Sequence, residues 1–274
     1  MKRAVVTGST GFIGKNLVAE LESLGWVIYG VLESHLDLHE WEDKLQKKLD
    51  AFKPDVIFHV GACSNTLELR SQYIMERNFQ STKFLVDWCK VNSIPLIYSS
   101  SAANYGINGR YPSNLYGWSK YVAEAYVSSN KFVSLRYFNV YGPGEENKDN
   151  MASFYHQAFS MRSKGQVPKL FPGGPRRDFV YIKDVISANL VAFENNKICS
   201  GGVYDVGTSN PRSFEEGLEI IGIEYSYASK DLIPIGYQNF TCANVGKRLP
   251  GWKPKFQLED GLSDYLRHLA GIYK

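Results

Sequence analysis

The run Ala4-Val5-Val6-Thr7-Gly8-Ser9-Thr10-Gly11-Phe12-Ile13-Gly14 decides the fold of this 274-residue chain. Its β-branched start predicts a strand, and the amphipathic segment 13–24 predicts a helix. Glycines spaced as Gly-x-x-Gly-x-x-Gly between them are related to the dinucleotide-binding fingerprint, in which the backbone approaches a pyrophosphate at a helix N-terminus. We predict that a dinucleotide binds against this loop, at Gly8, Thr10, Gly11, Phe12, Ile13 and Gly14. The alternative is that the glycines form only a tight turn between strand and helix.

Short apolar runs alternate with longer amphipathic segments through the first half of the chain. Strands are expected at 4–6, 27–32, 55–60, 95–98 and 132–137, and helices at 13–24, 40–49, 79–91 and 114–129. Such alternation is typical of a parallel sheet covered by helices on both faces. We predict an α/β fold, a Rossmann-type doubly wound parallel sheet with a smaller C-terminal α/β substrate lobe.

The pattern changes after about residue 141, where glycine and proline become frequent and the expected elements become shorter. Helices are expected at 152–164, 185–194 and 213–221, with a strand at 203–206. We therefore predict a dinucleotide-binding domain over 1–143. The range 144–274 is mainly the substrate-binding lobe, with some segments returning to the first domain.

The composition is that of an ordinary globular protein, with 44% hydrophobic and 22% charged residues. A net charge of +3, from 31 basic and 28 acidic residues, indicates neither a nucleic-acid nor a membrane partner. No apolar run approaches the roughly 20 residues that span a bilayer, and no signal peptide is expected. Four widely spaced cysteines without a Cys-x-x-Cys motif predict a cytoplasmic protein without a metal site.

Acidic residues follow the second predicted strand. A carboxylate at Glu33 can accept hydrogen bonds from both ribose hydroxyls and repel the extra phosphate of NADP, which favours NAD. No arginine occupies the next positions. Asp37 and Leu38 are placed to lie against the adenine, although Asp37 could equally cap the next helix.

The segment 116–120, Tyr-Gly-Trp-Ser-Lys, contains Tyr-x-x-x-Lys, which places Tyr116 and Lys120 on one face of a helix. A nearby ammonium is expected to lower the pKa of the phenol, so that Tyr116 exchanges a proton while a hydride moves. Ser101, at the end of a predicted strand, is placed to hydrogen-bond the same substrate oxygen. The alternative for the serine run is turn chemistry at a strand end.

Together these residues resemble the extended short-chain dehydrogenase/reductases that act on nucleotide sugars. The shared motifs also include His59-Val60-Gly61-Ala62, Asn78 and the segment 136–143, Arg-Tyr-Phe-Asn-Val-Tyr-Gly-Pro. The resemblance implies a nicotinamide cofactor, a nucleotide-sugar substrate and a homo-oligomer. It adds Gly61, Ala62 and Asn78 to the cofactor site, together with Tyr116 and Lys120.

Within that group, the second half of the chain is most similar to the ADP-glyceromanno-heptose 6-epimerases, through segments 144–153, 168–171, 177–181 and 237–241. In that family the nicotinamide oxidises C6″ of the heptose, and the ketone is reduced on its other face. The resemblance makes Tyr116 and Lys148 the acid/base pair, with Ser101 orienting the oxygen and Lys120 tuning Tyr116. The residues that it implies at the substrate are Ser101, Asn139, Lys148, Asn150, Gln157, Phe171, Arg177 and Tyr237.

Without the resemblance, the lobe residues alone assign fewer roles at the substrate site. Arg177 is a candidate phosphate clamp, whereas Lys148 could be a surface lysine and Tyr237 a core aromatic. Gln157 stands where the heptose epimerases have a substrate-contacting histidine.

The segment after Glu33 is shorter than in the heptose epimerases and is more similar to GDP-fucose synthase or dTDP-4-dehydrorhamnose reductase. A 4-keto reductase or a dehydratase is therefore the alternative function, although Ala102-Ala103 after the serines disfavours a dehydratase. A binding protein without catalysis is disfavoured by the presence of Ser101, Tyr116 and Lys120. The cofactor is expected to be tightly bound NAD or NADP, since Glu33 favours the first and the family the second.

Overall fold

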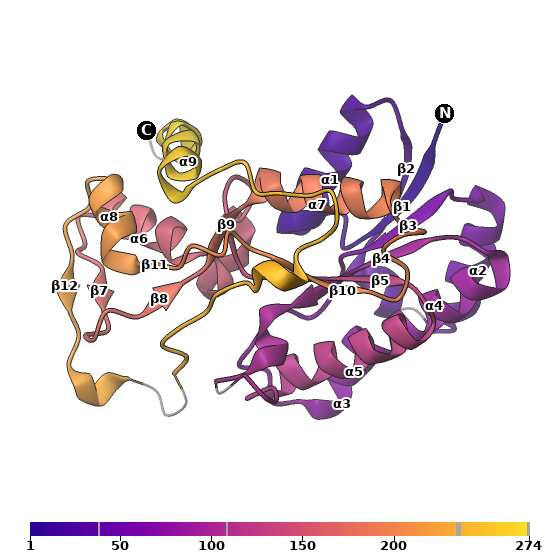
Figure 1. The fold of residues 1–274 in the computed structure, drawn as a ribbon, viewed down its shortest axis with the longest axis horizontal. Coiled ribbons are helices and arrows are strands. Elements are labelled where there is room, and N and C mark those ends of the chain that lie inside the picture. The colour runs from indigo at the N-terminus through magenta and orange to yellow at the C-terminus, as the bar shows by residue number, and fades with distance from the viewer. Residues whose placement is uncertain (38, 108, 234–236, 273–274) are drawn as a thin grey trace.

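The structure, a computed structural model, describes residues 1–37, 39–107, 109–233 and 237–272. Figure 1 shows a sheet with flanking helices on the right and a smaller lobe on the left. Among the described residues, the central sheet contains β1 (Arg3–Thr7), β2 (Val27–Val31), β3 (Val56–His59), β4 (Leu96–Ser101), β5 (Val133–Tyr137) and β10 (Val203–Val206). The helices around it are α1 (Phe12–Ser23), α2 (Trp41–Phe52), α3 (Ser71–Met75), α4 (Ser81–Asn92), α5 (Leu115–Ser129) and α7 (Ile182–Glu194).

The strands are all parallel, in the order β2-β1-β3-β4-β5-β10. The chain goes from β1 to β2 on one side and then to β3 on the other side of β1. This reversal creates a switch point, and ligands of open parallel sheets bind there, beyond the carboxyl ends of the strands. Thr7 lies opposite both Val31 and His59, so three strands end level at that point. The predicted Rossmann-type sheet is confirmed.

Alternating side chains of β1 enter two cores, one on each face of the sheet. Val5 packs with apolar residues of α2, α4 and α5. Ala4 and Val6 pack with residues of α1 and α7. Each strand therefore contributes to both helical layers, which explains why the strand sequences are apolar on both sides.

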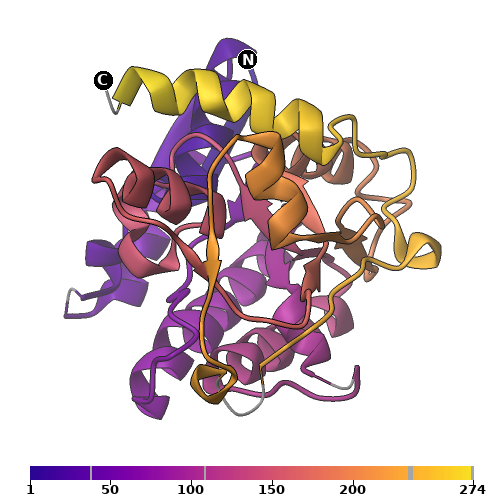
Figure 2. The same cartoon turned by 90° about the vertical axis from the view of Figure 1, so that its left-hand side faces the viewer.

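The lobe is built from short elements. Its helices are α6 (Phe154–Ser163), α8 (Phe214–Ile220) and α9 (Leu258–Ile272). Its strand pairs are β6 (Asn139–Tyr141) with β9 (Phe179–Tyr181), β8 (Arg176–Arg177) with β11 (Arg212–Ser213), and β7 (Lys169–Leu170) with β12 (Ser226–Tyr227). Figure 2 shows α9 crossing the top of this lobe over α8. The two-residue strands were not predicted, because so short a strand shows no alternation. From beyond residue 143, β10 pairs with β5, and α7 packs on α1.

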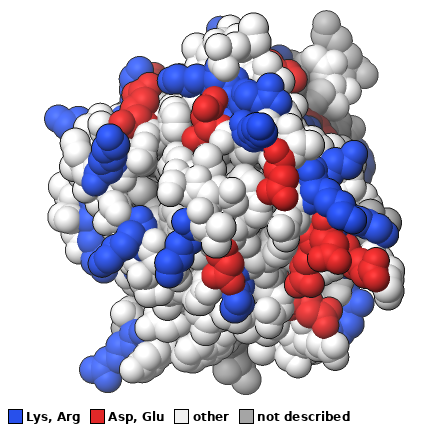
Figure 3. Space-filling model, turned by 90° about the vertical axis from the view of Figure 1, so that its right-hand side faces the viewer, with Lys and Arg blue, Asp and Glu red and all other residues white. Residues whose placement is uncertain are grey.

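The surface shows no dominant charge sign on the face drawn in Figure 3, where Lys and Arg side chains lie among Asp and Glu. Within the described ranges, no helix has the length and apolar character that crossing a bilayer requires. The same residues contain no group of three or more His, Cys, Asp and Glu side chains arranged to hold a metal ion.

A buried ion pair ties α5 to the sheet. Arg136 on β5 donates from Nε and Nη2 to the Glu124 carboxylate of α5, at 2.8 and 2.6 Å. Ser100 on β4 donates to the same carboxylate at 2.6 Å, and Asn104 donates to it at 3.1 Å. These bonds fix the position of α5, and with it Tyr116, above the ends of β4 and β5.

A second buried network fixes the protonation of His59. The Thr82 hydroxyl donates to the Asn78 carbonyl at 2.6 Å, so it accepts from His59 Nε2 at 2.8 Å. His59 Nδ1 then accepts from the Thr7 hydroxyl at 2.7 Å, and that oxygen accepts from the Gly61 N–H at 2.9 Å. Burial, and then the charge of Lys120, lower the pKa of His59 to about 3. The ring stays neutral and joins the end of β1 to the loop after β3.

We expect acid to destabilise the fold through His59. In the unfolded chain the imidazole takes up a proton below its ordinary pKa of 6.5, whereas in the folded protein it does so only near pH 3. The free energy of unfolding therefore falls by up to ~1.4 kcal/mol per pH unit as the pH drops below 6.5. We expect His59→Gln to have a lower free energy of unfolding than the wild-type protein at pH 7.5. Because the variant has no imidazole to titrate, the difference in free energy of unfolding between wild type and variant should narrow at pH 5. Urea unfolding at both pH values measures it, and a difference that does not change with pH would contradict the assignment.

Candidate active site

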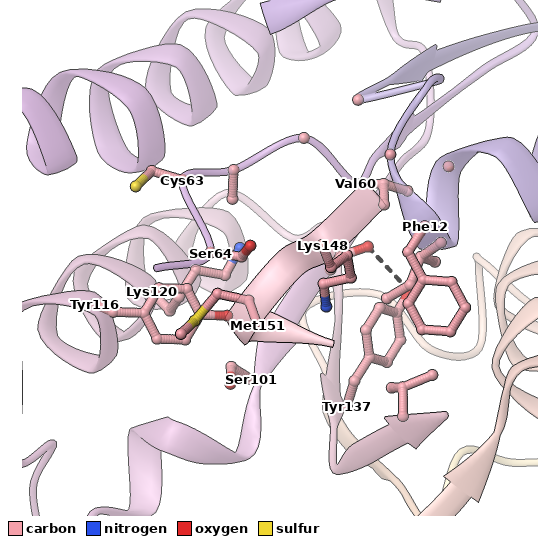
Figure 4. A pocket seen from close by; sticks show the side chains of 18 of the residues that line it. Phe12, Val60, Cys63, Ser64, Ser101, Tyr116, Lys120, Tyr137, Lys148 and Met151 are labelled. Carbon is pink, nitrogen blue, oxygen red and sulfur yellow. Dashed lines mark hydrogen bonds between the residues drawn. The ribbon is translucent and has the colours of Figure 1, made fainter. Parts of the chain in front are cut away.

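A cleft of about 880 Å³ lies at the carboxyl ends of the strands, between the sheet and the lobe. Sixteen of the predicted site residues line it, namely Gly8, Thr10, Gly11, Phe12, Ile13, Gly14, Glu33, Gly61, Ala62, Ser101, Tyr116, Lys120, Asn139, Lys148, Arg177 and Tyr237. Figure 4 looks into this cleft, with Tyr116, Lys120 and Ser101 on one side and Phe12 and Tyr137 on the other.

The glycine loop forms a cradle in which backbone contacts backbone. A Cβ atom on Gly14 would lie 2.0 Å from the Gly8 carbonyl oxygen. Gly8 itself has a φ of +62°, and a Cβ there would lie 2.7 Å from Gly61 Cα. The N-cap of α1 is Gly11, which makes no side-chain capping bond, and the first turn holds no acidic residue. The N–H groups of this helix start are therefore available to an anion, and the cradle fits the pyrophosphate of a dinucleotide.

At the β2 end of the cleft, an arginine joins the predicted carboxylates. Glu33 accepts a hydrogen bond from the Tyr73 hydroxyl at 3.0 Å. Arg77, from the π-helical turn Glu76–Gln80, also lines the cleft and forms an ion pair with Asp37. Arg77 gives no signal in the sequence, because it lies far from Glu33 along the chain and reaches Asp37 only through the fold. A basic residue does lie at this end of the cleft, neutralised by a carboxylate.

Tyr116 and Lys120 project from the first turns of α5, and Ser101 ends β4. Asn114 caps the helix by accepting from the Gly117 N–H at 2.8 Å. Burial raises the pKa of Tyr116, and a hydrogen bond with Ser101 opposes the rise. The predicted lowering of this pKa by Lys120 is therefore wrong, because burial dominates. Burial also lowers the pKa of Lys120 itself to about 7, against the attraction of Glu124.

Lys148 enters the cleft from the 3₁₀ segment Glu146–Met151 and points its amino group inward, as Figure 4 shows. Its Nζ lies 5.3 Å from the centre of the Phe12 ring. Burial lowers the pKa of Lys148, while Glu145 opposes the change. The side chain is half-buried and is therefore not the solvated lysine that a polar loop alone would indicate.

Two carboxylates hold the segment that carries Lys148. Glu145 is fully buried and accepts from the Ser153 hydroxyl at 2.7 Å and from the Ser153 N–H. Glu146 accepts from Lys15 of α1 at 3.3 Å and pairs with His268 of α9 at 2.9 Å. Despite burial, these bonds lower the pKa of Glu146 to about 2. The segment is thus tied to both parts of the molecule.

Arg177 is a buried cation at the lobe end of the cleft. It is 6% exposed, and Nη1 donates to the Arg176 carbonyl at 3.2 Å. Its guanidinium lies over the rings of Tyr237 and Phe214, at 5.1 and 5.7 Å from their centres. Among the described residues, no carboxylate pairs with it. A guanidinium placed in this way suits a phosphate group.

Two predicted cofactor residues do not reach the cleft wall. Asn78 is buried behind it, where its amide accepts from the Cys63 N–H at 2.7 Å and donates to the Cys63 carbonyl at 3.0 Å. It also donates to Ser119 at 2.8 Å, so it shapes the loop around Cys63. The Asp37 side chain is occupied by its ion pair.

The structure also does not bring every predicted substrate residue to the wall. Gln157 donates to the carbonyl of Ala152 at 2.8 Å. Phe171 packs against the Tyr237 ring, with the centres 5.1 Å apart, so it supports a wall residue. Leu38 and the side chain of Asn150 lie outside the described part of the structure.

Several wall residues had no signal in the sequence. They belong to no motif, and their position depends on loops whose course the sequence does not reveal. They include Trp41, Ser64, Thr66 and Phe214.

Comparison with known proteins identifies the family of this chain. A model described as the NAD dependent epimerase/dehydratase family matches residues 4–207. The chain belongs to this family. The matched range contains the glycine loop, Tyr116, Lys148 and Arg177, and the resemblance found in the sequence is confirmed at this level.

Solved structures of this fold include several epimerases. ADP-L-glycero-D-manno-heptose-6-epimerase from Helicobacter pylori is similar with 28% identity and a TM-score of 0.85, over 98% of this chain and 96% of its own. UDP-glucose 4-epimerase from Thermotoga maritima has 23% identity and a TM-score of 0.87, over 99% and 100%. UDP-N-acetylglucosamine 4-epimerase from Methanobrevibacter ruminantium M1 has 24% identity and a TM-score of 0.80, over 97% and 99%. At these identities the last two show the fold alone.

The backbone contact in the glycine loop gives a direct prediction. Gly14→Ala should lose dinucleotide binding and lower the melting temperature by several degrees, because the methyl group meets the Gly8 carbonyl. Gly271→Ala, at a helical position with nothing within 4 Å, is the matched control and should keep dinucleotide binding without lowering the melting temperature. Differential scanning fluorimetry with and without NAD measures both effects. Normal NAD binding in Gly14→Ala would contradict the cradle.

Proposed function

We propose that the protein is a nucleotide-sugar epimerase of the ADP-glyceromanno-heptose 6-epimerase type, with a tightly bound nicotinamide cofactor. The observation that carries the proposal is that two side chains able to exchange protons enter one cleft from different elements. Tyr116 comes from α5 and Lys148 from the segment after β6. An epimerase needs such a pair because the oxygen of the reacting carbon must lose and regain a proton in two orientations.

Burial prepares the two groups for opposite tasks. It raises the pKa of Tyr116, which favours the protonated phenol, and it lowers the pKa of Lys148, which favours the neutral amine. A bound nicotinamide would supply the hydride acceptor and donor for the carbinol carbon. Lys148 accepts the hydroxyl proton as the carbinol becomes a ketone. After the ketone has turned over in the cleft, Tyr116 donates a proton to its oxygen, and Ser101 orients that oxygen. Solvent then returns the proton from Lys148 to Tyr116, so a turnover consumes nothing.

Arg177 supports a diphosphate-linked substrate. Its buried guanidinium lies at the lobe end of the cleft with aromatic rings of Tyr237 and Phe214 beside it. A phosphate there would receive charge-assisted hydrogen bonds. The adjacent aromatic faces supply apolar contact for the rest of the nucleotide. Asn139 also lines the cleft and already accepts from Thr241 at 3.2 Å, which orients its amide.

The charges at the β2 end of the cleft favour NAD over NADP. Glu33 faces the position expected for the ribose hydroxyls. Arg77, the cation at hand for an added phosphate, is paired with Asp37. Glu33, Asp37 and Arg77 together carry one net negative charge, which suits a ribose 2′-hydroxyl and repels a 2′-phosphate.

The first test is to incubate the purified protein with ADP-D-glycero-D-manno-heptose, without added nicotinamide, and to follow the sugar by proton NMR. The proposal predicts the L-glycero epimer. An unchanged spectrum from protein that is shown to contain its cofactor would contradict the heptose assignment. Stoichiometric consumption of NADH or NADPH with a keto sugar would instead support the 4-keto reductase, which the short segment after Glu33 favours.

Removing the phenol tests the acid/base assignment. Tyr116→Phe should lower the rate of epimerisation by about 10²-fold or more, in line with the loss of a positioned proton donor. Tyr111→Phe is the matched control, because Tyr111 is 64% exposed and stacks on Trp118 away from the cleft wall. Equal rates for the two variants would remove Tyr116 from the mechanism.

Releasing Arg77 tests the cofactor assignment. Asp37→Asn breaks the ion pair and leaves a free guanidinium beside the ribose position, so NADP should gain about 10-fold in affinity relative to NAD, roughly one charge-assisted contact. Asp43→Asn, an exposed change of the same charge on α2, is the control. Fluorescence titrations with the reduced cofactors measure the ratio. The same shift in both variants would show a long-range charge effect and contradict the role of the ion pair.

A further inference from the structure

Lys120 is a cation buried against an aromatic face. It is 3% exposed, and its Nζ lies 4.3 Å from the centre of the Tyr98 ring. Tyr98 is fully buried on β4, in the middle of the sheet, on the face that α5 covers. On the neighbouring strand β3, the His59 ring packs against the Tyr98 ring, with the ring centres 5.6 Å apart. Its orientation beneath Lys120 is therefore fixed by the sheet.

The carboxylate near Lys120 is already in use. Glu124 attracts the ammonium, but it also accepts two hydrogen bonds from Arg136 and one from Ser100. Within the described ranges, no carboxylate oxygen lies within ion-pair distance of Lys120 Nζ. The charge of the lysine thus depends on a group other than a paired acid.

The remaining titratable groups around the ammonium carry no negative charge that would stabilise it. His59 is neutral and bonded through both ring nitrogens. Tyr116, one turn earlier on α5, is a protonated phenol. The negative face of an aromatic ring attracts an ammonium, and the attraction grows when water is excluded.

We infer that Tyr98 is a positioning residue, whose ring face holds the Lys120 ammonium charged and in place at the end of β4. The inference rests on the proposed function and adds to it that a charged Lys120, which lines the cleft beside Tyr116, serves cofactor binding. Without the ring, burial is opposed only by the shared Glu124, and Lys120 loses its proton at a lower pH. The enzyme would then lose activity at pH values where it now works.

The test compares rings of the same shape and opposite electrostatics. Tyr98→Phe keeps the negative ring face, whereas pentafluorophenylalanine, introduced at position 98 by nonsense suppression, reverses it with little change in shape. Tyr155→Leu is a control for the loss of a buried tyrosine, since Tyr155 is 1% exposed in the lobe. The readout is the pKa of Lys120, from ¹³C NMR titration of labelled lysine in the holoenzyme, with the resonance assigned through Lys120→Met.

We expect Tyr98→Phe and Tyr155→Leu to keep the pKa of Lys120 near its wild-type value. The fluorinated ring should lower it by about one unit, the size of a desolvated cation–π contact. The alkaline limb of the pH–rate profile should move down by the same amount. Equal pKa values for the Phe and pentafluorophenylalanine proteins would overturn the inference. The titration needs no sugar, so the expected shift in a protein that fails to epimerise would contradict the proposed function and leave the role of Tyr98 standing.

Discussion

The close approach of three glycine backbones is the constraint on which the site depends. Gly8 contacts Gly14 across the turn and Gly61 across the gap between β1 and β3, at distances that exclude a Cβ atom. This contact brings the start of α1 and the loop after β3 together at the switch point of the sheet. The His59 network ties the same two segments from below through Thr7 and Gly61. The same contacts leave the start of α1 open at the strand ends, where its N–H groups would hold the pyrophosphate of a dinucleotide.

The chemistry of the cleft follows from burying ionisable groups without pairing each of them. Glu124, Glu145 and Glu146 are satisfied by hydrogen bonds, and they hold α5 and the Lys148 segment in place. Lys120 and Lys148 have pKa values lowered by burial, and Tyr116 has a raised one. Buried groups with shifted pKa values are typical of catalytic sites. Here the carboxylates anchor the elements that carry the site, and in the proposed mechanism Tyr116 and Lys148 carry protons while Lys120 stays charged.

The sequence predicted those features that depend on local spacing. The glycine loop, the strand–helix alternation and the Tyr116/Lys120 helix face are all set by residues close together in the chain. What it missed depends on tertiary contacts. Arg77 reaches Asp37 only through the packing of the turn before α4, and Asn78 turns out to support Cys63. The pKa of Tyr116 was predicted in the wrong direction, because burial cannot be judged from the Tyr-x-x-x-Lys spacing. The two-residue strands of the lobe leave no pattern to detect.

In the proposed reaction, one cleft removes a hydride from a sugar carbon and returns it to the same carbon. The most direct measurement uses ADP-D-glycero-D-manno-heptose with deuterium at C6″, incubated in ordinary water with the holoenzyme and no added nicotinamide. We expect an L-glycero product that keeps its deuterium at C6″, because the hydride never leaves the cleft. Replacement of that deuterium by solvent hydrogen in the epimerised product would contradict it.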